Sequence, residues 1–126
     1  MKPRLLVVGG TGFIGYHVAK RAMSEGFDVY SISRNPPIPL REVKGVEYDF
    51  LDLLNNEHLK KFLNDKEFNY VVNTSGCINH QLFIDGGNKV FENHFLATKN
   101  LIHFLNRKKL KSFIHLGSSD EYGDNI

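Results

Sequence analysis

The sequence predicts an α/β fold in which about five parallel strands form a doubly wound sheet with helices on both faces. Two observations support this prediction. Short runs of branched apolar residues alternate with amphipathic segments along the chain, and a cluster of glycines joins the first apolar run to the first amphipathic segment. Strands that alternate with helices need right-handed crossovers, which make the strands parallel. We expect the sheet to be incomplete on its C-terminal side.

The first half of the chain contains clear strand and helix patterns. Leu5–Val8 is a short apolar run that stops at a glycine, which is typical of a strand buried on both faces. Phe13–Ser24 has apolar residues at helical spacing and is followed by Gly26, a natural C-terminal stop. Similar patterns predict strands at Val29–Ser33 and Gly45–Tyr48 and a helix at Glu57–Asn64.

The second half repeats the cycle, with a strand at Tyr70–Thr74, a helix at Lys89–Asn106 and a strand at Ser112–Leu116. Two segments fall outside it. Asn35–Gly45 holds three of the four prolines, so we expect a surface loop without helix. Cys77–Lys89 is a long connection with a glycine pair near its end. Long loops at the carboxyl ends of strands are where open α/β sheets bind ligands.

The composition fits one domain. The chain has 126 residues, of which 41% are hydrophobic, enough for one core and too few for two domains. The net charge of +2 gives no global basic field, which argues against nucleic-acid and membrane-surface partners and favours a small molecule. No apolar run is long enough to span a membrane and no secretory signal pattern is present, so we expect a cytoplasmic protein.

The cysteine and histidine content argues against a metal site. Cys77 is the only cysteine, which excludes an internal disulfide and fits a reducing compartment. The six histidines show no metal-ligand spacing. Arg107, Lys108, Lys109 and Lys111 are interpreted as solvated cations at a helix end, where they complement the helix dipole.

Gly9, Gly12 and Gly15 form a Gly-x-x-Gly-x-x-Gly pattern between the first strand and the first helix. Glycines at this place allow a tight turn, let backbone N–H groups approach a pyrophosphate, and let the helix pack closely on the strand. The positive end of the helix dipole adds to the attraction. We therefore predict a dinucleotide site, with the N–H groups of Phe13 and Ile14 at the phosphates.

The residues after the second strand indicate which dinucleotide binds. Proteins that bind NAD usually place an acid there, about 20 residues after the glycines, to accept hydrogen bonds from the ribose hydroxyls. This sequence has Ser33 followed by Arg34. A guanidinium can bind a 2′-phosphate with two charge-assisted hydrogen bonds, so we predict NADP(H) in preference to NAD(H). The alternative is that Arg34 is a solvated residue at the start of a loop.

Two acids in the segment YDFLDL receive different interpretations. Asp49 is expected to accept a hydrogen bond from the adenine amino group, with Phe50 or Leu51 beside the ring. Asp52 is interpreted as the N-cap of the following helix, because aspartate is a preferred capping residue.

The segments VGGTGFIG, SISR, DFLD, YVVNTSG, NHFLATKNL and HLGSSDEYG follow one another along essentially the whole chain. In this order they resemble the extended short-chain dehydrogenases, the NAD(P)-dependent sugar-nucleotide epimerase and dehydratase family. The resemblance implies a Rossmann-like fold, of which residues 1–126 are the N-terminal NAD(P)-binding portion without the substrate domain. It also implies a nucleotide-sugar substrate, and homodimer formation is left open.

The resemblance implies that Thr74, Ser75 and Gly76, after the fourth strand, lie on the nicotinamide side of the cofactor. Two positions of the long helix depart from the family pattern, since His94 stands where the family usually has Asn and Ala97 where it usually has Gly. Ala97 is expected to change the packing only slightly. His94 is interpreted as a buried histidine without a catalytic role.

The segment GSSDEYG resembles the family's active-site segment. Ser118 supplies the hydroxyl four residues before the tyrosine, and that hydroxyl would bind and polarise a sugar oxygen during hydride transfer. The dehydratase variant would instead use Ser119, Asp120 and Glu121, with the two acids moving protons in an elimination. Without the resemblance, these residues would be interpreted as turn caps and solvated acids.

The family's base is a tyrosine with a lysine four residues on, whose charge lowers the tyrosine pKa. That pair is expected after the serine segment and is not found before Ile126; Tyr16 and Lys20 share the spacing but follow the first strand. We therefore expect the cofactor-binding part of an NAD(P)-dependent epimerase, dehydratase or reductase, inactive by itself. The alternative is a non-catalytic NADP(H)-binding sensor or interaction module.

Overall fold

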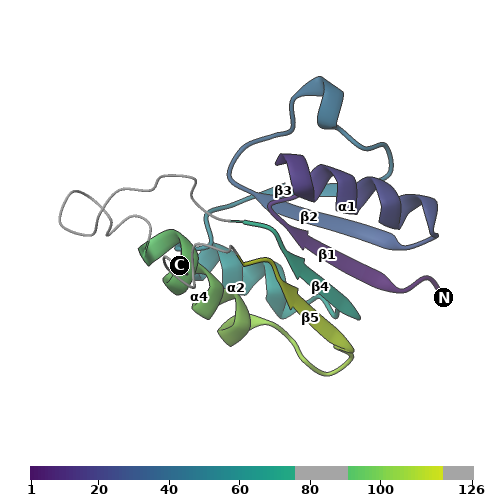
Figure 1. The fold of residues 1–126 in the computed structure, drawn as a ribbon. Coiled ribbons are helices and arrows are strands. Elements are labelled where there is room, and N and C mark those ends of the chain that lie inside the picture. The colour runs from purple at the N-terminus through teal and green to yellow at the C-terminus, as the bar shows by residue number, and fades with distance from the viewer. Residues whose placement is uncertain (76–90, 118–126) are drawn as a thin grey trace, which may run out of the picture.

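The computed structural model describes residues 1–75 and 91–117, which form one parallel sheet between layers of helix (Figure 1). The strands are β1 (Arg4–Val8), β2 (Asp28–Ser33), β3 (Glu47–Phe50), β4 (Tyr70–Asn73) and β5 (Ser112–His115), in the spatial order β3-β2-β1-β4-β5. The chain starts in the middle of the sheet, runs outward to β3 and returns to the other side of β1. This arrangement confirms the predicted doubly wound α/β fold.

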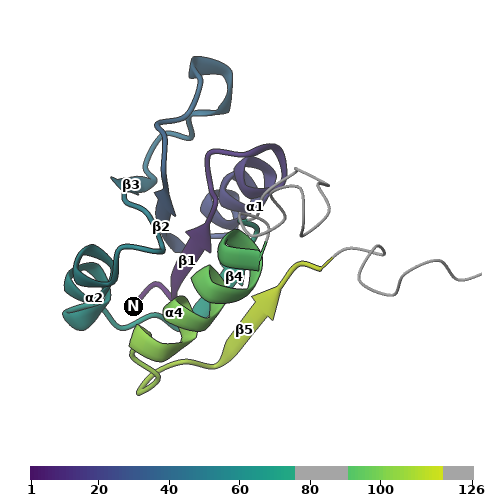
Figure 2. The same cartoon turned by 90° about the vertical axis from the view of Figure 1, so that its left-hand side faces the viewer.

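Helices cover both faces of the sheet (Figures 1 and 2). One face carries α1 (Phe13–Ser24), and the other carries α2 (Asn56–Asn64) and α4 (Ala97–Phe104). A π-helical segment, η3 (Glu92–Leu96), leads into α4. The connection between β2 and β3 contains a short 3₁₀ helix, η1 (Pro39–Arg41), and extends beyond the sheet in both views.

The central strand β1 is buried on both faces. Leu5 and Val7 belong to the apolar cluster under α1, whereas Leu6 and Val8 belong to the cluster under α2 and α4. Each of the four is 5% exposed or less. Because side chains alternate between the faces of a strand, a strand covered on both sides needs an unbroken apolar run. Burial of each side chain contributes about 1.5–3 kcal/mol.

Some strand boundaries differ from the prediction for local reasons. β3 covers Glu47–Phe50 instead of Gly45–Tyr48, because Gly45 has a φ of +93° and the Val46 N–H donates to the Val43 carbonyl in a turn. β4 and β5 each end one residue earlier than expected.

The expectation that the 35–45 segment contains no helix is wrong at Pro39–Arg41. Proline is tolerated at the first helical position, where no N–H is needed, and the Arg41 N–H donates to the Ile38 carbonyl at 2.8 Å. The long helix expected at Lys89–Asn106 ends at Phe104, and its Glu92–Leu96 segment is π-helical. No helix within residues 1–75 and 91–117 is long and apolar enough to cross a membrane.

Candidate functional site

The turn between β1 and α1 is a tight glycine turn. Gly9 has a φ of +84°, a conformation that other residues rarely adopt, and its N–H donates to the Ile32 carbonyl of β2 at 2.8 Å. A Cβ on Gly15 would collide with the Gly9 carbonyl oxygen. A Cβ on Gly12 would have room, because the nearest atom is the Gly9 oxygen at 3.5 Å. The fold therefore requires glycine at positions 9 and 15 but not at position 12.

The amino end of α1 is open. Gly12 is its N-cap residue, no side chain caps it, and the first turn contains no acid. Phe13 and Ile14, the first two helical residues, are 63% and 53% exposed. The first N–H groups of a helix have no partner within the helix, and together with the helix dipole they form a site for an anion.

A cleft of about 410 Å³ lies beside this turn, at the carboxyl ends of β1, β2 and β4. Among the residues predicted from the sequence, it is lined by Gly9, Gly12, Ser33, Arg34, Leu51, Thr74 and Ser75. In sequence order, β2 and β3 are added on one side of β1, and β4 and β5 on the other. The strand order therefore reverses direction beside β1, and open α/β sheets bind ligands at such a switch point. The volume is typical of small-molecule sites.

Other predicted residues lie away from the cleft lining or outside the described part. Phe13, Ile14 and Gly15 are in the first turn of α1, beside the cleft. Asp49 is half-buried in β3 opposite Ile32, and Phe50 is 49% exposed at the end of the same strand. The predictions for Gly76, Cys77, Ser118, Ser119, Asp120 and Glu121 concern residues outside the described ranges.

Asp52 lines the cleft and does not cap α2. The N-cap is Asn55, whose side chain accepts a hydrogen bond from the His58 N–H at 3.1 Å, so the capping interpretation of Asp52 is wrong. Asp52 instead uses Oδ1 to accept from the Leu54 N–H, two residues on, at 2.9 Å. Aspartate competes well for such local turns, which the sequence pattern alone does not distinguish from a cap.

Arg34 and Asp52 form an ion pair at the cleft. A guanidinium nitrogen of Arg34 lies 3.6 Å from Asp52 Oδ1, and the two side chains are 54% and 47% exposed. Arg34 follows β2 and Asp52 follows β3, which are neighbouring parallel strands. Their carboxyl ends meet at one edge of the sheet, and this brings together two charges that are 18 positions apart in sequence.

The buried side chain of Asn73 organises the β4 side of the cleft. Its Oδ1 accepts from the N–H and the hydroxyl of Ser75, at 3.1 and 2.6 Å. Its Nδ2 lies 3.2 Å from Thr98 Oγ1 of α4 and 3.2 Å from His115 Nδ1 of β5. Asn73 is missing from the sequence prediction, although a polar residue in the apolar run Tyr70–Thr74 was an available signal.

The two helix positions that depart from the family pattern differ in burial. His94 is exposed in η3, so its interpretation as a buried histidine is wrong. Ala97 is 3% exposed and lines the cleft, where a small side chain leaves space. Helical spacing alone does not show that the π-helical segment turns His94 outward.

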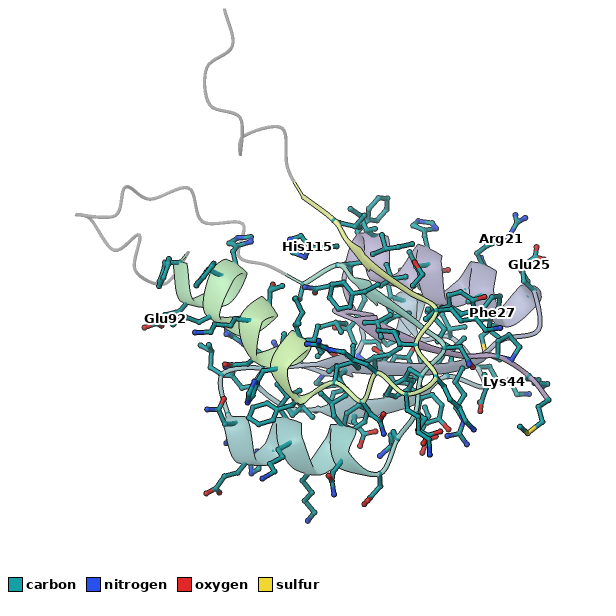
Figure 3. The ribbon with its side chains drawn as sticks, turned by 90° about the horizontal axis from the view of Figure 1, so that it is seen from below. Arg21, Glu25, Phe27, Lys44, Glu92 and His115 are labelled. Atoms are coloured by element: carbon teal, nitrogen blue, oxygen red, sulfur yellow. The ribbon has the colours of Figure 1, made fainter. Side chains whose placement is uncertain are left out.

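Charged groups at the amino ends of the strands are far from the cleft. Figure 3 shows His115 toward one end of the molecule and Lys44 toward the other. Arg4 Nε lies 3.7 Å from Asp28 Oδ2, and burial together with the Asp28 carboxylate raises the pKa of Tyr30.

Within the described ranges, no three histidine, cysteine or acidic side chains gather in a group that could hold a metal ion.

Comparison with known proteins identifies the family of this chain. The model of the NAD dependent epimerase/dehydratase family matches residues 5–126. A bifunctional UDP-glucose 4-epimerase and UDP-xylose 4-epimerase from Pisum sativum is 27% identical over 132 residues, which cover 95% of this chain and 38% of the relative.

Solved structures show the same fold. The UDP-glucose 4-epimerase of Thermotoga maritima, solved with UDP-glucose, matches with a TM-score of 0.85 at 18% identity, over 98% of this chain and 40% of its own. The UDP-glucose 4-epimerase of Brucella ovis, solved with NAD, matches with a TM-score of 0.82 at 21% identity, over 97% and 38%. This chain spans less than half the length of these proteins, and it belongs to the NAD-dependent epimerase/dehydratase family.

Proposed function

We propose that this chain is the cofactor-binding part of an enzyme that transfers a hydride between a nicotinamide cofactor and a hydroxyl of a nucleotide sugar, as an epimerase, dehydratase or reductase. Family membership and the UDP-sugar relative support the reaction and the substrate class. The observation that carries the proposal is the open amino end of α1 at the cleft. The fold itself has room for a side chain at Gly12. A pyrophosphate that approaches the backbone there would leave no such room, so the bound ligand explains why this position is glycine.

The residues present fit a dinucleotide along the cleft. The pyrophosphate would be held by the N–H groups of the first turn of α1, and the adenosine side would lie at the ends of β2 and β3. Arg34 lines the cleft there and supports a preference for NADP(H). The proposed contacts are Phe13 and Ile14 for the phosphates, Ser33, Arg34, Asp49 and Phe50 for the adenosine half, and Thr74, Ser75 and Gly76 for the nicotinamide half.

The bound nicotinamide supplies the hydride acceptor, and the chain supplies orientation and hydrogen bonds. Ser118 binds and polarises the sugar oxygen, or Ser119, Asp120 and Glu121 move protons in an elimination. The tyrosine–lysine pair that would accept the hydroxyl proton is not found after this segment within residues 1–126. We therefore expect these residues by themselves to bind cofactor without turnover.

The proposal extends to a homodimer formed through η3 and α4. Phe91 and Phe95 stack with ring centroids 5.1 Å apart and are 44% and 56% exposed, and Ile102 is 39% exposed. Exposed apolar side chains grouped along a helix favour a protein contact. Sedimentation equilibrium should show a dimer that Phe95→Ser weakens. A wild-type chain that sediments as a monomer would contradict this extension.

Fluorescence titration of the full chain with NADPH and NADH tests the central proposal. Wild type should bind, and Gly12→Ala should bind at least about tenfold more weakly, a loss of about 1.4 kcal/mol. The new methyl fits the fold, so the melting temperature should stay near that of wild type. Gly15→Ala is the comparison, since its Cβ meets the Gly9 carbonyl and should lower stability as well. Failure of wild type to bind either cofactor, or undiminished binding by Gly12→Ala, would refute the proposal.

A further inference from the structure

We propose that Asp52 determines the cofactor choice of this chain in two ways. It neutralises the charge of Arg34, and it supplies a carboxylate that can accept hydrogen bonds from the adenosine ribose, because the end of β2 has no acid for this role. The cleft would then accept NAD(H) as well as NADP(H), in contrast to a site in which Arg34 acts alone. This inference rests on the proposed dinucleotide binding.

The neighbouring strand β3 brings Asp52 to the end of β2. In the NAD-binding version of this fold the ribose acceptor is an acid at the end of the second strand, and Ser33 stands there instead. Ser33 pairs with Phe50 in the β2–β3 register, and the Leu51 N–H donates to the Ser33 carbonyl at 2.9 Å. The chain after β3 is thereby fastened to the end of β2, and Asp52 is the next residue. An acid therefore reaches the same corner of the cleft from the neighbouring strand.

The two carboxylate oxygens of Asp52 differ in their hydrogen bonds. Oδ1 is occupied by the Leu54 N–H at 2.9 Å, which fixes the carboxylate to its own turn. Within the described residues Oδ2 forms no hydrogen bond, so it is available to accept one from a ribose hydroxyl. The carboxylate is thus held in place by one oxygen and has an acceptor left in the other.

The ion pair between Arg34 and Asp52 is weak. The separation of 3.6 Å between Arg34 and Asp52 exceeds the 2.7–2.9 Å or so of a charge-assisted hydrogen bond, and both side chains are about half exposed. Pairs of this kind contribute about 0–1 kcal/mol, so a ligand can separate them at little cost. A 2′-phosphate that competes with Asp52 for the guanidinium therefore displaces little stabilisation from this ion pair.

Arg34 and Asp52 give the cleft lining two opposite charges. Among the described residues that line the cleft, Arg34 and Asp52 are the charged ones, and their charges cancel. A 2′-phosphate would be attracted by the guanidinium and repelled by the carboxylate close beside it. A ribose with free hydroxyls would instead find a carboxylate acceptor. The same pair thus lowers the preference for NADP(H) and raises the affinity for NAD(H).

The test measures the dissociation constants of NADH and NADPH for the full chain, as wild type and as Asp52→Asn. Asparagine keeps an oxygen for the Leu54 N–H but loses the charge. We expect NADPH to bind about tenfold more tightly, because a like charge is removed, and NADH to bind about threefold to tenfold more weakly, because a charged acceptor is lost. Damage to the fold would weaken both cofactors, so opposite changes are specific to the proposed role.

Asp65→Asn is the matched control, because it makes the same change in net charge at the C-cap of α2 and should alter neither constant. Asp52→Ser serves as a second variant, since serine also accepts from a backbone N–H two residues on. Arg34→Gln should weaken NADPH more in the Asp52→Asn background than in wild type. A ratio of the two constants that stays within about twofold of wild type in both Asp52 variants would overturn the inference. If wild type binds neither cofactor, the proposed function itself fails.

Discussion

Asn73 Nδ2 and His115 Nδ1 lie 3.2 Å apart at the carboxyl ends of β4 and β5. Because an amide nitrogen can only donate, the histidine nitrogen is the acceptor in this contact. The second amide hydrogen is directed at Thr98, and the amide oxygen accepts twice from Ser75. Every hydrogen-bonding position of this buried side chain is used, which ties α4 and β5 to the segment that enters the cleft.

Asn73→Ala should destabilise the fold by about 1–3 kcal/mol, because it leaves buried polar partners of the amide without hydrogen bonds. The same variant should weaken NADH binding, since Ser75 at the cleft loses both of its bonds to Asn73. Urea unfolding and cofactor titration measure the two effects. Asn64→Ala, at the exposed end of α2, is the control and should stay within about 0.5 kcal/mol of wild type. Equal stability of the two variants would show that the network contributes nothing.

Substitutions of Ser31 and Gly10 test the side-chain packing at the glycine turn. The Ser31 hydroxyl is fully buried and has no hydrogen-bond partner in the described part of the chain, so Ser31→Ala should leave stability unchanged or raise it by about 1 kcal/mol. A Cβ on Gly10 would collide with Ser31 Oγ, so Gly10→Ala should be destabilising.

The double variant separates the two causes. A Cβ at position 10 would still lie 2.8 Å from Ser31 Cβ, so Gly10→Ala with Ser31→Ala should recover only part of the lost stability. Thermal unfolding of the single and double variants measures this recovery. No recovery would mean that the hydroxyl is not the obstructing group.

Asn55→Ala should destabilise α2 by about 1 kcal/mol, because it removes the side chain that accepts from the His58 N–H. Asn56→Ala, one residue further into the helix, makes the same truncation without removing a cap and should have a much smaller effect. If the two variants lower the free energy of unfolding equally in chemical denaturation, Asn55 is not the capping residue.

The local part of the fold could be predicted from the sequence. The unbroken apolar run of β1 indicates a strand covered on both faces, and the glycines after it indicate a tight turn into a helix. These features depend on neighbouring residues, as do the bounds of α1, which agree with the prediction. The errors are local as well: the Gly45 turn delays β3, and η1 begins at a proline that the helix tolerates.

The site could be predicted only in part. Spacing within one segment led to Gly9, Gly12, Ser33 and Arg34, all of which line the cleft. The sequence alone predicts that Asp52 caps α2, because it shows that an acid precedes the helix but not which backbone N–H donates to the carboxylate. Asn73 was missed because its partners come from α4 and β5.

The sequence by itself determined the alternation of strands and helices, the glycine turn and the family, since each is encoded in contiguous residues or in their order along the chain. Only the tertiary structure decided that the strand order is β3-β2-β1-β4-β5, that Arg34 meets Asp52, and that Asn73 meets His115. The physical reason is that a parallel sheet aligns the ends of strands that are far apart in sequence. Which charges and amides then face one another depends on strand order and register, and neither is written in any one segment.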